Sequence, residues 1–228
     1  MAPLPSSKTT RDFIRSPRKK LADIKDALSF RDTFTEVFIE ETYLWLAREI
    51  RPNTTVVDIG AFIGDSALYF ARFPNVKRVL AYEPYPRNYA LAKRYIGMSP
   101  LRKKIRISNL GVTHDGISRD ISRSNNFQSF LLNERKGASD RNVVRSITLS
   151  KILHGLKNVA IKCDCEGGER HLFKGVDMRE VYAIELEYHG RDDLKGVLEG
   201  LKGKGFAIRR ADHEDGMGGG ILMAKRKG

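Results

Sequence analysis

Short runs of β-branched and aliphatic residues alternate with helical segments along most of this chain. The runs predict strands at residues 55–59, 79–82, 105–107, 159–161 and 181–184, with helical segments between several of them. Strands that are joined through helices pair in parallel, and the helices then cover both faces of the sheet. The alternation therefore predicts an α/β fold built on a mostly parallel sheet.

The order of these elements also predicts where a ligand binds. Crossovers between parallel strands are right-handed, so the carboxyl ends of the strands meet at one edge of the sheet. Ligands of such folds bind in the crevice at that edge. The residues directly after each predicted strand are therefore the candidates for a functional site.

The first predicted strand ends in an acid and a glycine-containing loop. Gly60 allows a tight turn and the close approach of a ligand, and the N-terminus of the following helix offers free N–H groups. A glycine turn that only joins strand to helix is the alternative. The candidate cofactor-binding residues of this loop, in the pattern D-x-G-x-x-x-G, are Asp58, Gly60, Ala61, Phe62, Gly64 and Asp65.

This loop differs from the dinucleotide fingerprint G-x-G-x-x-G. Phe62 stands where a second glycine would admit a pyrophosphate. An acid at the end of the strand repels a pyrophosphate, whereas it can accept a hydrogen bond from an ammonium group. This chemistry suits S-adenosylmethionine, which has an amino-acid end and a ribose but no phosphate.

The second predicted strand ends in Glu83 and Pro84. One carboxylate can accept hydrogen bonds from both hydroxyls of a ribose, and the end of the second strand is a suitable place for it. An acid at a strand end can also be a helix cap or a solvated turn residue. Together with the glycine loop, Glu83 and Pro84 predict a nucleoside site.

Four segments in this order resemble the FkbM-type class I methyltransferases. Two of them are residues 57–65 and 81–84, described above. The third is Ile147-Thr148-Leu149, where Ser150 replaces the usual acid of the family. The fourth, residues 161–169, resembles the strand-end signature Lys-x-Asp-x-Glu-Gly-x-Glu.

The resemblance implies a Rossmann-like fold with a mostly parallel seven-stranded sheet, an antiparallel last strand and helices on both faces. It implies S-adenosylmethionine as cofactor and the O-methylation of a hydroxyl on a sugar, lipid or small metabolite. It also implies that Asn109 lies beside the adenine pocket.

Carboxylates follow the two later strands. Asp164 and Glu166 leave one strand together with Glu169, beside Lys162, and such a group repels itself unless a cation or a proton intervenes. Caps on the following helix are the alternative for Glu166 and Glu169. Asp164 is predicted to bind the cofactor near its sulfonium and to orient or deprotonate the acceptor hydroxyl.

The next strand ends in Glu185, Glu187 and His189, which alternate onto one face. With Asp164 they can share one pocket, so Asp164, Glu185 and His189 are the predicted catalytic residues. His189 has the pKa of a general base at neutral pH, although a histidine in a loop is often only a surface residue. A divalent metal on Asp164, Glu185 and His189 is an alternative from ligand type, but we expect none.

The chain carries 41 Lys and Arg against 28 Asp and Glu, a net charge of +13. A basic surface favours polyanions, so RNA is the alternative acceptor. The basic residues gather near both termini and in one central cluster without acids, which comprises Arg87, Lys93, Arg94, Arg102, Lys103, Lys104 and Arg106. No RNA-recognition signature accompanies them, and no Asn-Pro-Pro-Tyr-like loop of base N-methylation follows the fourth strand.

Two function classes without methyl transfer are further alternatives. A Rossmann-like domain could bind nucleic acid through its basic faces without catalysis, and it would then tolerate Asp164→Asn. A nicotinamide-dependent oxidoreductase could share the architecture, but the missing middle glycine argues against it.

The composition along the chain predicts three parts: a flexible basic arm at residues 1–16, N-terminal helices at 17–52 that pack on the core, and the methyltransferase domain at 53–228. Within the second part, Thr33 and Glu36 form a capping box that predicts a helix over 33–49. No apolar run can span a bilayer and residues 1–20 lack a signal sequence, so we expect a cytoplasmic protein. Cys163 and Cys165 are interpreted as strand residues on one face of a sheet.

Overall fold

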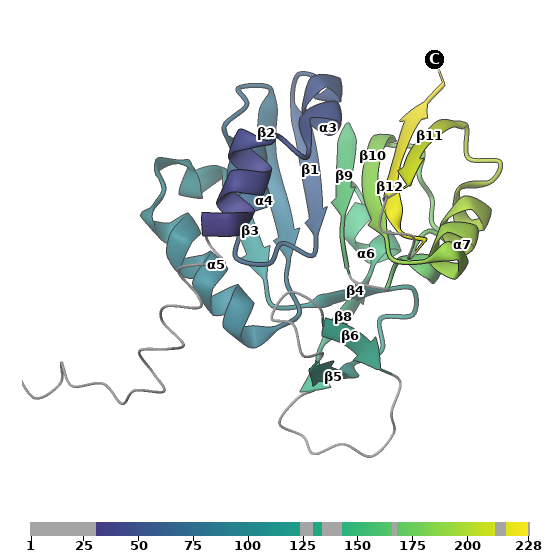
Figure 1. The fold of residues 1–228 in the computed structure, drawn as a ribbon. Helices are drawn as coiled ribbons and strands as arrows, with labels where there is room; N and C mark the ends of the chain where they lie inside the picture. The colour runs from purple at the N-terminus through teal and green to yellow at the C-terminus, as the bar shows by residue number, and fades with distance from the viewer. Residues whose placement is uncertain (1–30, 124–129, 134–142, 166–167, 213–217, 228) are drawn as a thin grey trace, which may run out of the picture.

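A seven-stranded sheet forms the centre of the computed structural model, which describes residues 31–123, 130–133, 143–165, 168–212 and 218–227 (Figure 1). The predicted arm at 1–16 and the first part of the predicted N-terminal helices, residues 17–30, lie outside the described residues. The strand order is β11-β12-β10-β9-β1-β2-β3. These strands are β1 (Thr54–Ile59), β2 (Val76–Tyr82), β3 (Ile105–Ser108), β9 (Val159–Cys163), β10 (Val181–Tyr188), β11 (Phe206–Asp212) and β12 (Gly220–Arg226).

The strand directions confirm the predicted sheet. Strands β3, β2, β1, β9 and β10 are successive parallel neighbours, and β12 pairs antiparallel with both β10 and β11. The antiparallel strand is inserted between β10 and β11, so the last hairpin closes one side of the sheet. The carboxyl ends of β1, β2, β9 and β10 consequently meet at the lower edge of the sheet in Figure 1.

Helices cover both faces of the sheet, as the alternating pattern predicts. One face packs against α3 (Leu44–Glu49), α4 (Asp65–Ala71) and α5 (Pro86–Met98). The other face packs against α6 (Leu149–Leu153), the short helix η4 (Glu169–His171) and α7 (Arg191–Leu201). Along β1, Val57 and Ile59 belong to the second core and Val56 to the first, because successive strand residues point to opposite faces.

Two small sheets are formed by the part of the chain between β3 and β9. One pairs β4 (Gly111–Thr113) with β8 (Ser146–Thr148), and the other has the order β6-β5-β7. The latter strands are β5 (Arg119–Arg123), β6 (Phe130–Asn133) and β7 (Val143–Val144). Both small sheets lie below the carboxyl edge of the main sheet, on the side where the ligand crevice is expected (Figure 1).

The N-terminal helix predicted over 33–49 is interrupted. Residues 31–34 are already α-helical and lead into the π-helical turn η1 (Thr35–Ile39), so Thr33 is not the start of the helix and the predicted capping box is wrong. The chain then turns at Glu41, whose φ is 52°, before α3 begins. Val37 and Leu46 are nevertheless buried in the core, so this segment packs on the sheet.

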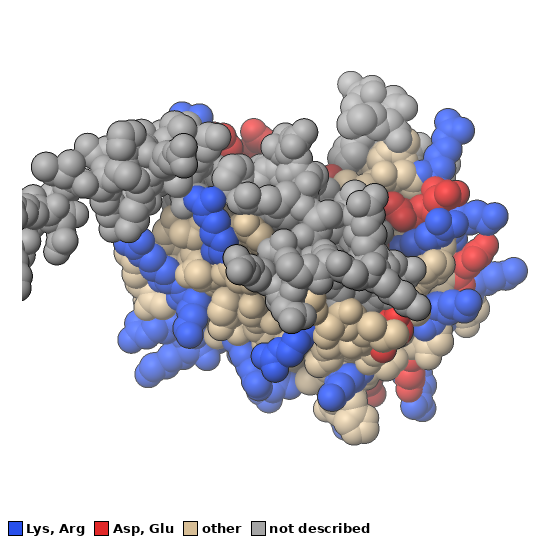
Figure 2. Space-filling view, turned by 90° about the horizontal axis from the view of Figure 1, so that it is seen from below, with Lys and Arg blue, Asp and Glu red and all other residues tan. Residues whose placement is uncertain are grey.

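The helices in the described part of the chain are too short or too polar to span a bilayer. The view from below shows lysine and arginine side chains around much of the rim of the molecule (Figure 2). Of the central basic cluster, Lys93, Arg94, Arg102, Lys103 and Arg106 are exposed on α5, on the short helix η2 (Pro100–Lys104) and on β3. Lys104 instead donates to the carbonyl oxygens of Ala71 and Phe73, so part of this cluster is structural.

Candidate active site

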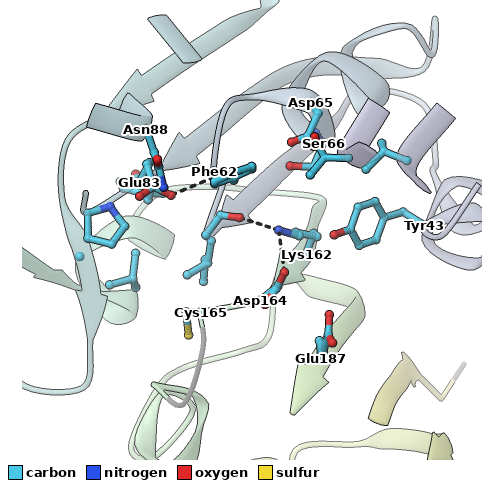
Figure 3. A pocket seen from close by; sticks show the side chains of 18 of the residues that line it. Tyr43, Phe62, Asp65, Ser66, Glu83, Asn88, Lys162, Asp164, Cys165 and Glu187 are labelled. Atoms are coloured by element: carbon cyan, nitrogen blue, oxygen red, sulfur yellow. Dashed lines mark hydrogen bonds and ion pairs between the residues drawn. The ribbon is translucent and has the colours of Figure 1, made fainter. Parts of the chain in front are cut away.

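A cavity of about 220 Å³ opens at the carboxyl ends of β1, β2, β9 and β10 (Figure 3). It lies where the order of the elements predicts a ligand crevice. Its described lining residues come from the N-terminal segment, from the loops after these strands and from the start of β4. They are Thr33, Glu36, Val37, Tyr43, Ile59, Gly60, Phe62, Asp65, Ser66, Tyr82, Glu83, Pro84, Asn88, Leu110, Gly111, Val112, Lys162, Asp164, Cys165 and Glu187.

Strand register places three ionisable side chains in one row beneath this cavity. Asp58 on β1 is paired with Lys162 on β9, and Lys162 is paired with Glu185 on β10. All three side chains are buried on the face that α3 and α4 cover, because their apolar neighbours in sequence point to the opposite face. These three side chains therefore form a row of ionisable groups across β1, β9 and β10, inside an otherwise apolar sheet.

Lys162 is the centre of this row. Its Nζ donates to the carbonyl oxygen of Gly60 at 2.6 Å and lies 3.5 Å from Asp58 Oδ1 and 4.0 Å from Asp164 Oδ2. Burial alone would lower the pKa of Lys162, but Tyr43 and the surrounding carboxylates raise it well above its ordinary value. Lys162 is thus a charged ammonium group. It compensates the carboxylates of Asp58 and Asp164, which would otherwise repel each other.

Gly60 makes the turn that brings the strands β1 and β9 together at the cavity. Its φ is +76°, and a Cβ atom there would lie 1.6 Å from the carbonyl oxygen of Asp164. The glycine is therefore needed for the close approach of Asp164, whereas the sequence suggested the close approach of a ligand. Both Gly60 and Ala61 donate their N–H groups to the carbonyl oxygen of Tyr82, which fixes the loop to β2.

Glu83 is buried at the end of β2, in the cavity wall. Its two oxygens accept hydrogen bonds from the backbone N–H groups of Phe62 (2.9 Å) and Tyr85 (2.8 Å). Burial raises the pKa of Glu83 to about 8, although these two hydrogen bonds and Asn88 act to lower it. The backbone contacts hold the carboxyl group in one position beside the glycine loop, as the predicted nucleoside site requires.

Several predicted cofactor-binding residues support the cavity without lining it. Asp58 accepts a hydrogen bond from Ser66 Oγ at 2.7 Å, while its buried Oδ1 makes no hydrogen bond within the described part of the chain. Asn109 donates through Nδ2 to the carbonyl oxygens of Glu83 and Pro84, so it fixes that loop, and Leu110 to Val112 line the cavity in its place. Ala61 is fully buried within the glycine loop.

Gly64 and Asp65 form the start of α4. Gly64 precedes the helix with a φ of +87°, and its Cα faces Ala92 and Ile96 of α5. Asp65 lines the cavity, and its Oδ1 accepts the N–H group of Ser66. The N–H group of Ser66, one of the helix N-terminal groups that we expected to be open to a ligand, is therefore bound to the side chain of Asp65.

The three predicted catalytic residues separate into two places. Asp164 lines the cavity, and Nε2 of His189 lies 3.9 Å from its Oδ1. Glu185 instead lies under α3, where its Oε2 accepts the N–H group of Leu46 at 2.9 Å. Burial raises the pKa of Glu185 to about 7. Glu187, two residues further along β10, is the residue of this strand that reaches the cavity.

His189 is held between acidic groups at the end of β10. Its Nδ1 lies 3.6 Å from Glu169 Oε1, and its Nε2 lies 3.9 Å from Glu187 Oε1. Glu169 is fully buried at the start of η4 and also accepts the N–H group of Cys165. Burial raises the pKa of Glu169, but its contacts with His189 and with backbone N–H groups bring it below its ordinary value.

The interpretation of the two cysteines as strand residues is correct for Cys163 and wrong for Cys165, which follows the end of β9. Their Sγ atoms are 3.7 Å apart and are not bonded to each other as a disulfide. Cys163 ends β9 in the core under α6 and α7, and Cys165 lines the cavity.

The N-terminal segment supplies cavity residues to which the sequence patterns gave no role in a site. Thr33, Glu36 and Val37 lie on the helical turns 31–39, and Tyr43 precedes α3 with its ring 5.4 Å from Lys162 Nζ. The sequence assigned these residues only to helix packing. Lys162 did carry a local signal, because a charged residue inside the apolar run 159–163 requires a buried partner.

The cavity is acidic although the chain as a whole is basic. Glu36, Asp65, Glu83, Asp164 and Glu187 line it, and Lys162 is the one Lys or Arg among the described lining residues. Burial, followed by the charges of Glu187 and Asp65, raises the pKa of Glu36. Such a site favours a ligand with cationic groups and hydroxyl donors over one that carries phosphates.

Comparison with known proteins agrees with this chemistry. A family model described as the Methyltransferase FkbM domain matches residues 58–208, which include the glycine loop, Glu83 and Asp164. No curated protein sequence matches the chain.

Several solved structures with a similar fold are described as methyltransferases. An FkbM methyltransferase from Methylobacillus flagellatus KT is 18% identical, with a TM-score of 0.54 over 75% of this chain and 43% of that chain. M. capricolum TrmK in complex with S-adenosylhomocysteine is 12% identical, with a TM-score of 0.52 over 80% and 66% of the two chains. The Geobacter metallireducens GS-15 precorrin-6y C5,15-methyltransferase is 14% identical, with a TM-score of 0.50 over 82% and 88%. The present chain thus spans less than half of the similar FkbM structure and just under two thirds of TrmK.

Proposed function

Because this chain belongs to the FkbM methyltransferase family, we propose that it transfers a methyl group from S-adenosylmethionine to a hydroxyl group on a sugar, a lipid or a small metabolite. Family and fold make it an S-adenosylmethionine-dependent methyltransferase. The acceptor class is the part of the proposal that rests on the cavity. The observation that carries it is the acidic lining around Lys162.

The residues of the cavity fit S-adenosylmethionine, which supplies an electrophilic methyl group on a sulfonium when bound. Glu83 is held by two backbone N–H groups and offers its carboxylate to the ribose hydroxyls. Asp65 and Asp164 provide negative charge for the ammonium and sulfonium groups. Gly60 and Phe62 form the loop beneath the ligand, and Leu110 to Val112 give the apolar wall for the adenine.

The same lining favours an uncharged acceptor. Asp164 and Glu187 face the cavity at the end where β9 and β10 finish, and a phosphodiester brought there would meet two carboxylates (Figure 3). A hydroxyl group instead donates a hydrogen bond to a carboxylate, which orients the oxygen toward the methyl group. A neutral hydroxyl compound therefore fits this end better than a polyanion.

RNA is the second candidate acceptor, and one observation favours it. Lys93, Arg94, Arg102, Lys103 and Arg106 form an exposed basic surface over α5, η2 and β3. This surface could hold a phosphate backbone while a single ribose hydroxyl reaches the cavity. RNA binding of this kind would weaken steeply between low and physiological salt, because each phosphate contact releases counterions.

Methyl transfer into fractionated extract tests both candidates. The protein is incubated with radiolabelled S-adenosylmethionine and host extract, and RNA, glycan-lipid and small-molecule pools are then separated. Label in the glycan-lipid or small-molecule pool is the expected result. Label confined to RNA would overturn the proposed acceptor and assign a substrate-binding role to the basic surface on α5. No label in any pool would contradict turnover on these acceptors.

The raised pKa of Glu83 predicts that cofactor affinity depends on pH. The free carboxyl group, with a pKa of about 8, is mostly protonated at pH 7. The carboxylate accepts both ribose hydroxyls, so binding must release a proton below pH 8. The affinity for S-adenosylhomocysteine is therefore expected to rise with pH by up to about tenfold per unit below pH 8, and to level off above it. Calorimetry at pH 6–9 measures the trend.

Glu83→Gln is the control for this titration. The amide has no charge to gain, so the variant is expected to bind more weakly and to lose the part of the pH dependence that Glu83 causes. Titration of the ligand itself remains in the variant and is thereby subtracted. Equal pH profiles for the two proteins would show that Glu83 does not change its protonation when the ligand binds.

A further inference from the structure

Asp164, Glu187 and His189 bring three metal-ligating groups together at the outer end of the cavity. One ligand atom of each lies within 4.8 Å of the others. Asp164 and Glu187 line the cavity, and both carboxyl groups are turned toward the same part of it (Figure 3). Asp164 follows β9, Glu187 lies near the end of the adjacent strand β10 and His189 follows it, so the rigid end of the sheet fixes their spacing.

Glu169 gives an independent indication of what His189 is oriented to do. Its Oε1 lies 3.6 Å from Nδ1 of the imidazole, whereas Nε2 faces both Asp164 and Glu187 at 3.9 Å. A buried carboxylate on one ring nitrogen and carboxylates around the other is the usual environment of a metal-ligating histidine. Glu169 is itself held by the N–H group of Cys165, so the orientation of the ring is anchored in the backbone.

The two oxygens of Asp164 have separate surroundings. Oδ2 lies 4.0 Å from Lys162 Nζ, on the cofactor side of the carboxyl group. Oδ1 lies toward His189. Lys162 therefore compensates Asp58 and the Oδ2 side of Asp164. Oδ1 of Asp164, together with Glu187 and Glu169, surrounds the imidazole of His189 with negative charge.

From this geometry we infer that Asp164, Glu187 and His189 bind a divalent cation of the Mg²⁺ and Mn²⁺ class at the acceptor end of the cavity. Two carboxylates and one imidazole leave coordination positions for water or an acceptor oxygen, and such oxygen-rich sets suit these ions. The inference deepens the proposed function and rests on it for the role of the ion. His189 is then a metal ligand rather than a general base. The sequence suggested Asp164, Glu185 and His189 as the alternative ligand set, and Glu187 replaces Glu185 in it.

The cation would bind the acceptor oxygen and stabilise it as the proton is lost. In the transfer, a bond forms between this oxygen and the methyl carbon while the bond between carbon and sulfur breaks, and its electron pair stays on sulfur. The hydroxyl proton passes to water at the partly exposed mouth of the site. A bound cation favours this loss because it lowers the pKa of an oxygen ligand.

Manganese binding tests the site without relying on turnover. The full chain is titrated with Mn²⁺, and the loss of the free-ion electron paramagnetic resonance signal counts the bound ions. One saturable site per chain is expected in the wild type. Glu187→Gln is expected to weaken it by about tenfold or more, and Glu169→Gln, which changes only a positioning residue, by roughly 10–100-fold.

Glu180→Gln is the matched control, because Glu180 is an exposed glutamate that directly precedes the same strand β10. It should bind Mn²⁺ like the wild type, and thermal unfolding checks that each variant is folded. The absence of saturable binding in the wild type, or equal affinity in the wild type and Glu187→Gln, would overturn the inference.

Calorimetry with S-adenosylhomocysteine in EDTA separates this inference from the proposed function. If S-adenosylhomocysteine binds but the wild type has no Mn²⁺ site, the metal site is overturned and the cofactor assignment stands. If the Mn²⁺ site is present and sensitive to Glu187→Gln, but S-adenosylhomocysteine does not bind, the metal site stands and the cofactor pocket is overturned.

Discussion

Gly60→Ala is expected to lower the free energy of unfolding by roughly 2–5 kcal/mol and to abolish cofactor binding. Two costs add up in the variant: the left-handed backbone conformation, and the collision of the added methyl group with rigid backbone. The φ of Gly60 is +76°, and the new Cβ would lie 1.6 Å from the carbonyl oxygen of Asp164. The loop or the end of β9 must move, and either shift separates the glycine loop from Asp164 at the cavity. Urea unfolding and calorimetry with S-adenosylhomocysteine measure the two effects.

Gly155→Ala is the matched control for this variant. Gly155 has a similar φ of +71°, but an added Cβ would meet nothing within 4 Å. It should therefore show only the conformational cost, about 1–2 kcal/mol, and retain cofactor binding. If both variants lost the same stability, the carbonyl group of Asp164 would have to be free to move, and the close contact between the two loops would not position the site.

Lys162→Met is expected to lower the free energy of unfolding by about 3–5 kcal/mol at neutral pH, the usual cost of removing one partner from a buried ion pair. Methionine fills a similar volume, so the loss is mainly electrostatic. Without the ammonium group, Asp58 keeps only its hydrogen bond from Ser66, and Asp164 faces the cavity uncompensated. Cofactor affinity should fall as well, because Lys162 also holds the carbonyl oxygen of Gly60.

The pH dependence of this loss identifies its cause. Lys162 has a raised pKa in the folded protein, so its stabilising contribution is present throughout the neutral range and is lost only in strong alkali. In the variant, the uncompensated carboxyl groups can take up protons as the pH falls. The difference in unfolding free energy between the wild type and Lys162→Met should therefore shrink from pH 7 to pH 5.

Lys157→Met is the control, since Lys157 is exposed just before the same strand. It should leave the unfolding free energy nearly unchanged at both pH values, as surface substitutions usually do. If the unfolding free energy that Lys162→Met loses were the same at both pH values, the loss would come from packing and not from charge compensation.

Much of the fold could be predicted from the sequence because its signals are local. The alternation of apolar strands and helices, with glycines after β1, predicted the parallel sheet and the edge at which the cavity lies. The helix over 33–49 could not be predicted correctly. Its apolar spacing is continuous, but the chain packs around α4 through the π-helical turn η1 and a turn at Glu41, and contacts distant in sequence decide such breaks.

The sequence by itself also determined which acids follow which strands, and hence that Glu83 and Asp164 would meet near the glycine loop. Only the tertiary structure decided how deep each acid lies. Glu185 and Glu187 share one face of β10 because strand residues alternate, yet α3 covers the first and leaves the second at the cavity. Asn109 likewise turned inward to fix a loop. The strand period gives a side chain its face, but whether that face is buried or open depends on the segment that packs over it.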